Sequence, residues 1–455
     1  MAIPQRYLMT GLLLLVNIFC YMDRTNIGIV IGEFGYTQAM NGFILSAFFY
    51  GYIATQMLGG YGTQRIGAKA TLLVGILVWT AGDVTTIAAA TIPAFLIACR
   101  VIMGLGEGVN YPCVHHFASV WFPKEEKSFL TSIVSSGMDL GTIFSFLVAP
   151  RIIKTLGWQY VFVVAGALNI FWAIAFFFLG SNDPESSKRI SPEEKDIITA
   201  EKKHSVVDQH HAATPWKGLL TKPAFLAIYT SHFCMNYAWY VLLSWIPTYF
   251  KHELGINLKQ NPILGALPYM CGFVGSIVAG RVSDFLIKKA PFGMKPVHTR
   301  KLFNSLGQFL PGVFLFLVTS MKSTAGALVL LCLVMVFGRM VMCGYWVNML
   351  DVAPDYAGQV MGISNTIATI PGILGNTITG VILDKTDSWF LVFAIAACIN
   401  FIGGIVFLIF AQGEPQEFTK PVPGCDHVKL AGHSSQQPSV NQELPEVPSA
   451  PNQSV

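Results

Sequence analysis

The amino-acid sequence predicts an all-α membrane protein whose twelve transmembrane helices form two six-helix bundles. The chain has 455 residues, of which 53% are hydrophobic and only 12% are charged, against about 25% charged residues in an ordinary soluble domain. Apolar stretches of the roughly 20 residues that a helix needs to cross a bilayer recur along the chain. One polar stretch divides them into six and six. This composition argues against a soluble enzyme, and nine cysteines are too few for a disulfide scaffold.

The N-terminal bundle is expected to occupy residues 1–181. Its six apolar segments are each long enough to span the hydrocarbon core. The first is too long for a signal peptide and lacks a small-residue cleavage site, so we expect it to remain as a membrane span. The segments cover approximately residues 7–31, 40–61, 68–90, 94–121, 128–155 and 158–180.

A polar connector is predicted over residues 182–222. Within it, Ser191 is followed by Pro192 and, three residues after the serine, by Glu194. This is the pattern of a helix start, with Ser191 as N-cap, Pro192 as first helical residue and Glu194 as capping-box partner. We therefore expect a short surface helix over about Pro192–Lys203.

The C-terminal bundle is expected over residues 223–412 and a disordered tail over 413–455. The tail is rich in Pro, Ser, Gln and Asn, a composition that cannot bury enough apolar surface to fold. The six apolar segments of this bundle cover approximately residues 223–250, 262–287, 299–321, 325–350, 357–383 and 388–412.

Lysine and arginine are unevenly distributed between the predicted loops. The connector carries seven of them, and the loop between the eighth and ninth spans adds five more. Because cytosolic loops are enriched in these residues, we expect the connector and both termini to be cytosolic. The protein is then integral and multi-pass, in the plasma membrane or in an endolysosomal or vesicular membrane. A net charge of +4 gives no basic patch for nucleic acid.

Three of the arginines inside predicted spans are candidates for a functional site, because an ionisable group there costs at least a few kcal/mol. They are Arg24 in the first span, Arg100 in the fourth and Arg339 in the tenth. The planar guanidinium matches a carboxylate or phosphate, so one hypothesis is an anion site in a water-filled cavity. The alternative is structural ion pairing, with Arg24 against Asp23 or Asp139, and with Arg100 against the acid in its own span. For Arg339 a packing or gating salt bridge is as good a hypothesis.

Three carboxylates in the spans are candidates for proton coupling: Glu107, Asp23 and Asp139. Desolvation favours the protonated form of a carboxyl group and a nearby cation favours the ionised form. Glu107 lies seven residues after Arg100, about 10 Å along one helix face, so movement of the arginine or its anion would change the protonation of Glu107. Asp139 can be a third titrating group or the counter-ion of an arginine.

Several motifs resemble the anion:cation symporter family of the major facilitator superfamily, over about residues 8–412. That family includes sialin, vesicular glutamate transporters, sodium–phosphate carriers, plant plastid anion transporters and bacterial hexonate transporters. The motifs are Arg100-xxx-Gly104-xx-Glu107-Gly108-xx-Tyr111-Pro112 with Trp121-Phe122-Pro123, Ser136-Gly137-xxx-Gly141, Gly157-Trp158-xx-Val161-Phe162, Leu242-Leu243-Ser244-Trp245-Ile246-Pro247-Thr248-Tyr249 and Asn348-xx-Asp351-Val352-Ala353-Pro354-x-Tyr356-Ala357-Gly358, continuing to Gly362-Ile363-Ser364-Asn365-Thr366.

The resemblance implies the major facilitator fold and a function for each matching residue. Arg24 and Arg100 match the anion-binding arginines, and Glu107 matches a proton site. Bacterial members also have a titrating Asp at the position of Asp23. Further positions match the substrate cavity: Tyr21, Tyr52 and Asn365.

Departures from the family pattern bear on the substrate. Leu45 and Met235 replace a His and an Arg of the glutamate carriers, and Met138 replaces a Gln of the hexonate carriers. Neither glutamate nor a sugar acid is therefore favoured. Arg339 stands where the family usually has a small residue, and an added cation favours a doubly charged anion such as phosphate or a dicarboxylate.

The sequence as a whole predicts a secondary active transporter for a small organic or inorganic anion, working by alternating access and H⁺ symport. We expect a monomer that contacts only lipid and substrate and needs no cofactor. No HExxH, paired CxxC or nucleophile elbow is present, so an enzyme is not expected. The alternatives are a Na⁺-coupled phosphate transporter and, in another class, a non-transporting anion sensor.

Overall fold

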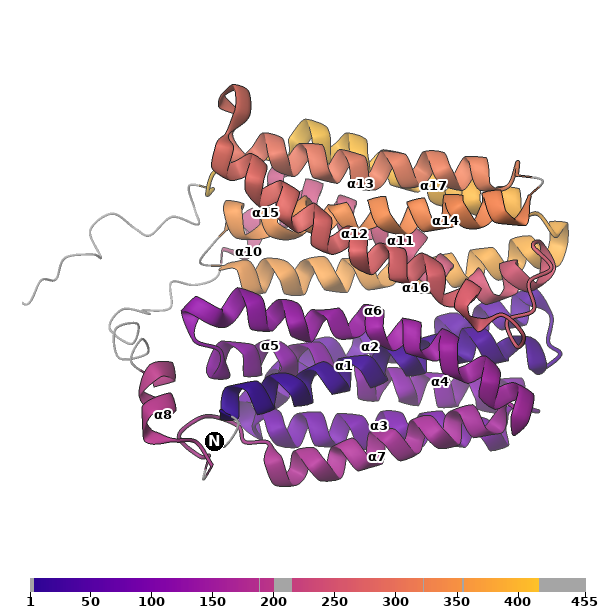
Figure 1. Cartoon of the computed structure of the whole chain (residues 1–455), viewed down its shortest axis with the longest axis horizontal. Coiled ribbons are helices and arrows are strands. Elements are labelled where there is room, and N and C mark those ends of the chain that lie inside the picture. The colour runs from indigo at the N-terminus through magenta and orange to yellow at the C-terminus, as the bar shows by residue number, and fades with distance from the viewer. Residues whose placement is uncertain (1–3, 188, 200–214, 322, 354–355, 417–455) are drawn as a thin grey trace, which may run out of the picture. The chain divides into compact units, whose positions relative to one another are not determined.

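The computed structural model describes residues 4–187, 189–199, 215–321, 323–353 and 356–416, and within them the regular structure is helical (Figure 1). Long helices run side by side through residues 5–179 and again through residues 223–410, which we call the N-terminal and C-terminal halves. Both halves belong to one compact unit. The helices of the N-terminal half are α1 Gln5–Val30, α2 Gln38–Arg65, α3 Ala68–Ala89, α4 Pro93–Glu107, α5 Asn110–Trp121, α6 Lys124–Thr155 and α7 Gln159–Leu179.

The C-terminal half repeats this pattern of long helices. They are α11 Pro223–His252, α12 Pro262–Lys289, α13 Pro296–Val318, α14 Thr324–Gly338, α15 Tyr345–Val352, α16 Ala357–Thr386 and α17 Trp389–Phe410. Ten helical segments of the described chain are long and apolar enough to cross a membrane. The long helices α2 and α11 fall on the two remaining predicted spans, so every predicted span coincides with helix. The fold class predicted from the sequence is confirmed.

Two of the predicted spans are interrupted, which the hydropathy pattern did not indicate. In the fourth span α4 ends at Glu107 and α5 begins at Asn110. Pro112 has no amide hydrogen to bond to the carbonyl of Gly108, so the helix cannot continue regularly there. In the tenth span α14 ends at Gly338 and a 3₁₀ helix, Arg339–Cys343, precedes α15. Both breaks lie at a residue that the sequence analysis singled out.

Glycines bring α2 and α4 into backbone contact. A Cβ on Gly104 would overlap the carbonyl oxygen of Phe48, and a Cβ on Gly51 would overlap the carbonyl oxygen of Val101. Small residues allow this approach in membrane helices, where dispersion contacts replace the hydrophobic effect as the source of association. The contact sets Arg100 on α4 against the aromatic side chains of α2.

The two halves touch along α2 and α16. The Ser46 and Thr377 hydroxyls lie 3.0 Å apart. Gln56 donates to Thr369 Oγ1 at 3.2 Å and accepts from Asn365 Nδ2 at 3.2 Å. These contacts cross from one half to the other, so relative movement of the halves must break them.

The predicted surface helix is α8, Pro192–Thr199, which lies beside the beginning of α1 (Figure 1). The Glu194 amide donates to Ser191 Oγ at 3.2 Å, as an N-cap requires. The Glu194 carboxylate does not complete the capping box. It accepts instead from the amides of Gln5 at 2.8 Å and Arg6 at 2.9 Å, so one acidic side chain satisfies free N–H groups at the start of a distant helix.

A second carboxylate joins this cluster outside the membrane-spanning part of α6. Glu126 accepts from Arg6 Nε at 2.9 Å and from the Tyr7 hydroxyl at 3.2 Å. The hydrogen bond from Arg6 holds the pKa of Glu126 below its usual range. The domain boundaries at 181, 222 and 412 remain predictions, as does disorder of the tail, of which residues 417–455 lie outside the described residues.

Replacing Gly104 by valine should destabilise the protein by about 1–3 kcal/mol, because the added atoms force α2 and α4 apart. Thermal unfolding of the purified protein in detergent measures the change. Gly11→Ala is the matched control, since a Cβ at Gly11 has no neighbour within 4 Å. Equal midpoints for Gly104→Val and wild type would contradict the packing described here.

Candidate functional site

Arg24 lies on α1 in a cage of aromatic rings and one carboxylate. Its guanidinium carbon is 4.5 Å from the ring centre of Tyr52, 4.9 Å from that of Phe48 and 5.0 Å from that of Tyr21. Its Nε donates to Glu107 Oε2 at 2.6 Å. Cation–π contacts and one ion pair together compensate a guanidinium that has left water.

Glu107 is fully buried at the end of α4. Besides Arg24, its Oε2 accepts from the Cys20 thiol at 3.0 Å. The sequence analysis gave, as the alternative to an anion site, ion pairs of Arg24 with Asp23 or Asp139 and of Arg100 with Glu107. The structure pairs Arg24 with Glu107 instead. Two side chains two turns apart on one helix stand about 10 Å apart, so the neighbouring helix α1 supplies the nearer cation.

Arg100 is buried without a carboxylate in hydrogen-bond contact among the described residues. Its Nη1 lies 2.7 Å from Met103 Sδ, and its Nε has no hydrogen-bond partner in that part of the chain. The guanidinium carbon is 5.3 Å from the ring centre of Phe48, whose ring also contacts Arg24. An unsatisfied buried guanidinium is costly, and a bound anion is the group that would satisfy it.

Both arginines line one small cavity between the halves. Its water-accessible volume is about 10 Å³, which is room for about one water molecule. A larger anion therefore requires the surrounding helices to separate. The remaining lining residues come from α1, α2 and α11: Ile27, Leu45, Phe48, Phe49, Leu243 and Ser244.

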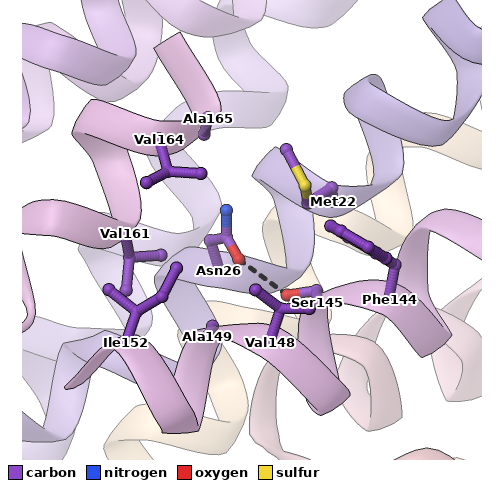
Figure 2. Close-up of a pocket in the computed structure, with 10 residues that line it drawn as sticks. All are labelled: Met22, Asn26, Phe144, Ser145, Val148, Ala149, Ile152, Val161, Val164 and Ala165. Atoms are coloured by element: carbon purple, nitrogen blue, oxygen red, sulfur yellow. Dashed lines mark hydrogen bonds between the residues drawn. The ribbon is translucent and has the colours of Figure 1, made fainter. Parts of the chain in front are cut away.

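A second pocket of similar size lies between α1, α6 and α7 (Figure 2). Figure 2 shows mostly apolar side chains, including the Phe144 ring and Met22, around one hydrogen bond, in which Ser145 Oγ donates to Asn26 Oδ1 at 2.7 Å. Met22 and Asn26 stand two residues on either side of Arg24, which places them on the opposite face of α1. None of the residues that line this apolar pocket is cationic.

The tyrosines and the asparagine predicted for the substrate cavity lie in two places. Tyr21 and Tyr52 pack against Arg24, and the Tyr21 hydroxyl accepts from Tyr111 at 3.3 Å. Asn365 lies on α16 and bonds to Gln56 across the two halves. Gln56 was not singled out in the sequence. Its position as a polar residue inside the apolar second predicted span could have identified it.

Asp23 and an acid that sequence reasoning missed, Asp83, are both buried in the N-terminal half. Asp23 Oδ2 accepts from Asn169 Nδ2 of α7 at 2.8 Å. Asp83 lies on α3 and is fully buried. It stood in the sequence as an isolated acid inside the third span, which was a sufficient signal by the same desolvation argument that selected Asp23.

Arg339 and Asp139 form an ion pair across the halves. The Arg339 Nη2 donates to Asp139 Oδ1, and each side chain is only 9% exposed. The Arg339 guanidinium also lies 4.2 Å from the ring centre of Trp239 on α11. Of the two alternatives for these residues, the observed geometry matches the structural or gating ion pair. Within the described residues, no three His, Cys, Asp or Glu side chains gather to bind a metal.

Comparison with known proteins gives matches over nearly the whole chain. The family model described as Major Facilitator Superfamily matches residues 13–376. Human sialin is 38% identical over 381 residues, which are 83% of this chain and 76% of sialin. The chloroplastic ascorbate transporter of Arabidopsis thaliana is 33% identical over 416 residues, 90% of this chain and 76% of the transporter.

Among solved structures, the crystal structure of a D-xylose–proton symporter superposes with a TM-score of 0.69. The superposition covers 89% of this chain and 98% of the symporter, and the two sequences are 14% identical. At that identity the likeness concerns the fold, and it agrees with the helices described above.

Removing one member of the Asp139–Arg339 pair should destabilise the protein by about 3–5 kcal/mol, because the other charge stays buried without a partner. We expect Asp139→Asn to lower the thermal midpoint strongly. The double variant Asp139→Leu/Arg339→Met should regain most of the loss, since it buries no charge.

The more exposed pair Glu33–Lys259, with a 2.8 Å separation, is the matched control. Exposed pairs contribute about 1 kcal/mol or less, so Glu33→Gln should leave the midpoint nearly unchanged. A midpoint for Asp139→Asn equal to that of Glu33→Gln would show that the ion pair contributes nothing.

Proposed function

The chain belongs to the major facilitator superfamily, and within it to the anion:cation symporter family; from this premise we propose that it carries a small anion by alternating access, coupled to H⁺. It is an integral, multi-pass membrane protein. The proposal further includes cytosolic termini, from the lysine and arginine distribution, and a monomeric state. The chloroplastic ascorbate transporter supports an anionic cargo by its name.

The observation that carries the proposal is the pair of arginines on one cavity, only one of which has a carboxylate partner. Arg24 is neutralised by Glu107, whereas the Arg100 Nε has no hydrogen-bond partner among the described residues. An anion bound at this cavity would supply Arg100 with the charge-assisted hydrogen bonds that it lacks. Carboxylate and phosphate both fit the guanidinium fork.

The ion pair between Arg24 and Glu107 connects the anion to the proton. An anion that enters the cavity competes with Glu107 for Arg24. A carboxylate that loses its cation in a buried site favours protonation, so arrival of the anion promotes proton uptake at Glu107. Release of the anion restores the ion pair and expels the proton. The two cargoes then move together.

Alternating access needs the halves to separate on one side at a time. The contacts that must break include the Gln56 hydrogen bonds and the Asp139–Arg339 ion pair. Helix breaks next to Glu107 and at Arg339 provide positions where the backbone can change direction. Two of the site residues, Glu107 and Arg339, therefore lie at helix breaks.

Two other functions give different results in one assay. A sodium-coupled phosphate transporter would require Na⁺ for uptake and would not respond to a pH gradient alone. An anion sensor on the same fold would bind without flux. Uptake of labelled ascorbate, N-acetylneuraminate and inorganic phosphate into proteoliposomes, driven by a pH gradient alone or by a Na⁺ gradient alone, separates these functions from the proposal.

Arg100→Ala should lower the affinity for the anion about 10-fold to 100-fold. This is the equivalent of about 1.5–3 kcal/mol, the contribution of hydrogen bonds to a charged group. The half-saturating concentration in counterflow measures this. Arg100→Lys should recover only part of the affinity, because an ammonium lacks the planar fork. Arg151→Ala, at an exposed arginine on α6, is the control. Equal concentrations for the two alanine variants would refute the anion site.

Glu107→Gln should abolish uptake driven by a pH gradient while leaving counterflow without a gradient in place. Counterflow exchanges loaded carriers and needs no net proton movement, whereas symport needs the carboxylate to give up its proton. Radiolabelled anion measures both rates: uptake driven by a pH gradient and counterflow without a gradient. A Glu107→Gln protein that still concentrates anion from a pH gradient would remove Glu107 from the coupling mechanism.

A further inference from the structure

The Arg100 guanidinium is held by a sulfur atom of its own helix. Its Nη1 lies 2.7 Å from the Sδ of Met103, three residues later on α4. Both side chains are buried. Within the described residues this is the one hydrogen bond that the guanidinium makes, and the Arg100 Nε has no partner there. Met103 therefore occupies the position nearest to the arginine that an anion would approach.

The spacing of residues along α4 explains why the partner is a sulfur and not an oxygen. Side chains three and four residues apart on a helix are neighbours. The residues at this spacing from Arg100 are Leu96, Ile97, Met103 and Gly104. None of their side chains carries an oxygen, and the Met103 sulfur is the one lone-pair donor that they offer. A thioether is a weak hydrogen-bond acceptor, so it compensates little of the guanidinium charge.

The acids of the N-terminal half do not take the place of a stronger acceptor. Asp83, Glu107 and Asp23 attract Arg100 through their charges, but none of them accepts a hydrogen bond from it in the described part of the chain. Glu107 bonds to Arg24 instead. The Arg100 guanidinium therefore has one N–H group without an acceptor and another whose acceptor is weak.

We propose that Met103 sets the anion affinity of the cavity, because its sulfur holds the Arg100 guanidinium with an acceptor that an anion can displace. An oxygen of a carboxylate or phosphate forms a charge-assisted hydrogen bond, which is stronger than one to a thioether. Methionine has three rotatable side-chain bonds and adapts to a changed neighbour, so its sulfur can withdraw when the anion arrives. Met103 is a positioning residue, and the inference rests on the proposed function.

An acceptor at position 103 has opposite effects on the empty protein and on anion binding. In the empty protein it satisfies a buried guanidinium, and so it adds stability. Binding of the anion breaks that hydrogen bond, so the same contribution is lost from the affinity. A stronger acceptor therefore stabilises the empty protein and weakens binding, whereas an apolar side chain does the reverse. A residue that only filled space would not produce these opposite changes.

The experiment compares Met103→Gln with Met103→Leu. Leucine keeps the volume and removes the acceptor, whereas glutamine supplies an amide oxygen. The half-saturating concentration in counterflow, measured with labelled ascorbate, N-acetylneuraminate and inorganic phosphate in turn, should be about 10-fold higher for Met103→Gln than for Met103→Leu. The maximal exchange rate should be the same. Without any anion, the thermal midpoint of Met103→Gln should be the higher of the two.

Met335, a buried methionine on α14, provides the matched control. It does not line the cavity that Arg24 and Arg100 share. Burying an amide in an apolar core is unfavourable, so Met335→Gln should have a lower thermal midpoint than Met335→Leu. This is the reverse of the order expected at position 103. The half-saturating concentrations of the two Met335 variants should be equal.

Two results would overturn the inference: equal half-saturating concentrations for the two Met103 variants, or a midpoint of folded Met103→Gln below that of Met103→Leu. The midpoints need no anion, so they decide the inference even where wild type shows no saturable exchange, which is how the proposed function itself would fail. Should the glutamine variant not fold, Met103→Leu is compared with wild type. Its half-saturating concentration should then be lower, and an unchanged value would overturn the inference.

Discussion

The ion pair between Arg24 and Glu107 is the interaction on which the site depends. Placing charges in a protein interior costs several kcal/mol for each ion unless the partner is close and well oriented. The 2.6 Å contact and the aromatic rings around Arg24 meet that condition. The same contact occupies Glu107 and so leaves Arg100 without a carboxylate partner. In the proposed function, this one buried pair determines which cation is available to the anion.

The helix packing makes this arrangement possible. Backbone contact between α2 and α4 at Gly51 and Gly104 brings Phe48 between the two arginines. The end of α4 at Glu107 lets its carboxylate turn toward α1. Pro112 prevents α4 from continuing as a regular helix into α5. Small residues and a helix break are thus part of the site, although none of them binds a ligand.

Charge balance applies to the Asp139–Arg339 and Arg24–Glu107 ion pairs. Asp139 and Arg339 neutralise each other across the halves, so their separation is coupled to movement of the halves. Within the N-terminal half, Arg24 and Glu107 neutralise each other in the same way. In the proposed transport cycle, an anion at the cavity would compete with Glu107 for Arg24 and so favour protonation of Glu107.

The sequence alone was sufficient to predict the membrane spans, the helix start at Ser191 and three arginines, Arg24, Arg100 and Arg339, that the structure buries. These features depend on local composition, because a span is recognised by its own transfer from water to lipid. It also selected Glu107 and Asp23 as buried acids. The same reasoning applied to Asp83 would have found it.

Only the tertiary structure decided which charges meet. Glu107 pairs with Arg24 rather than with Arg100, Asp139 reaches Arg339 in the other half, and Glu194 caps α1 instead of its own helix. These partners lie 83, 200 and 189 residues apart in the chain. Such contacts depend on how helices cross and where they break, and an ion pair is set by distances of a few ångströms that no local pattern encodes.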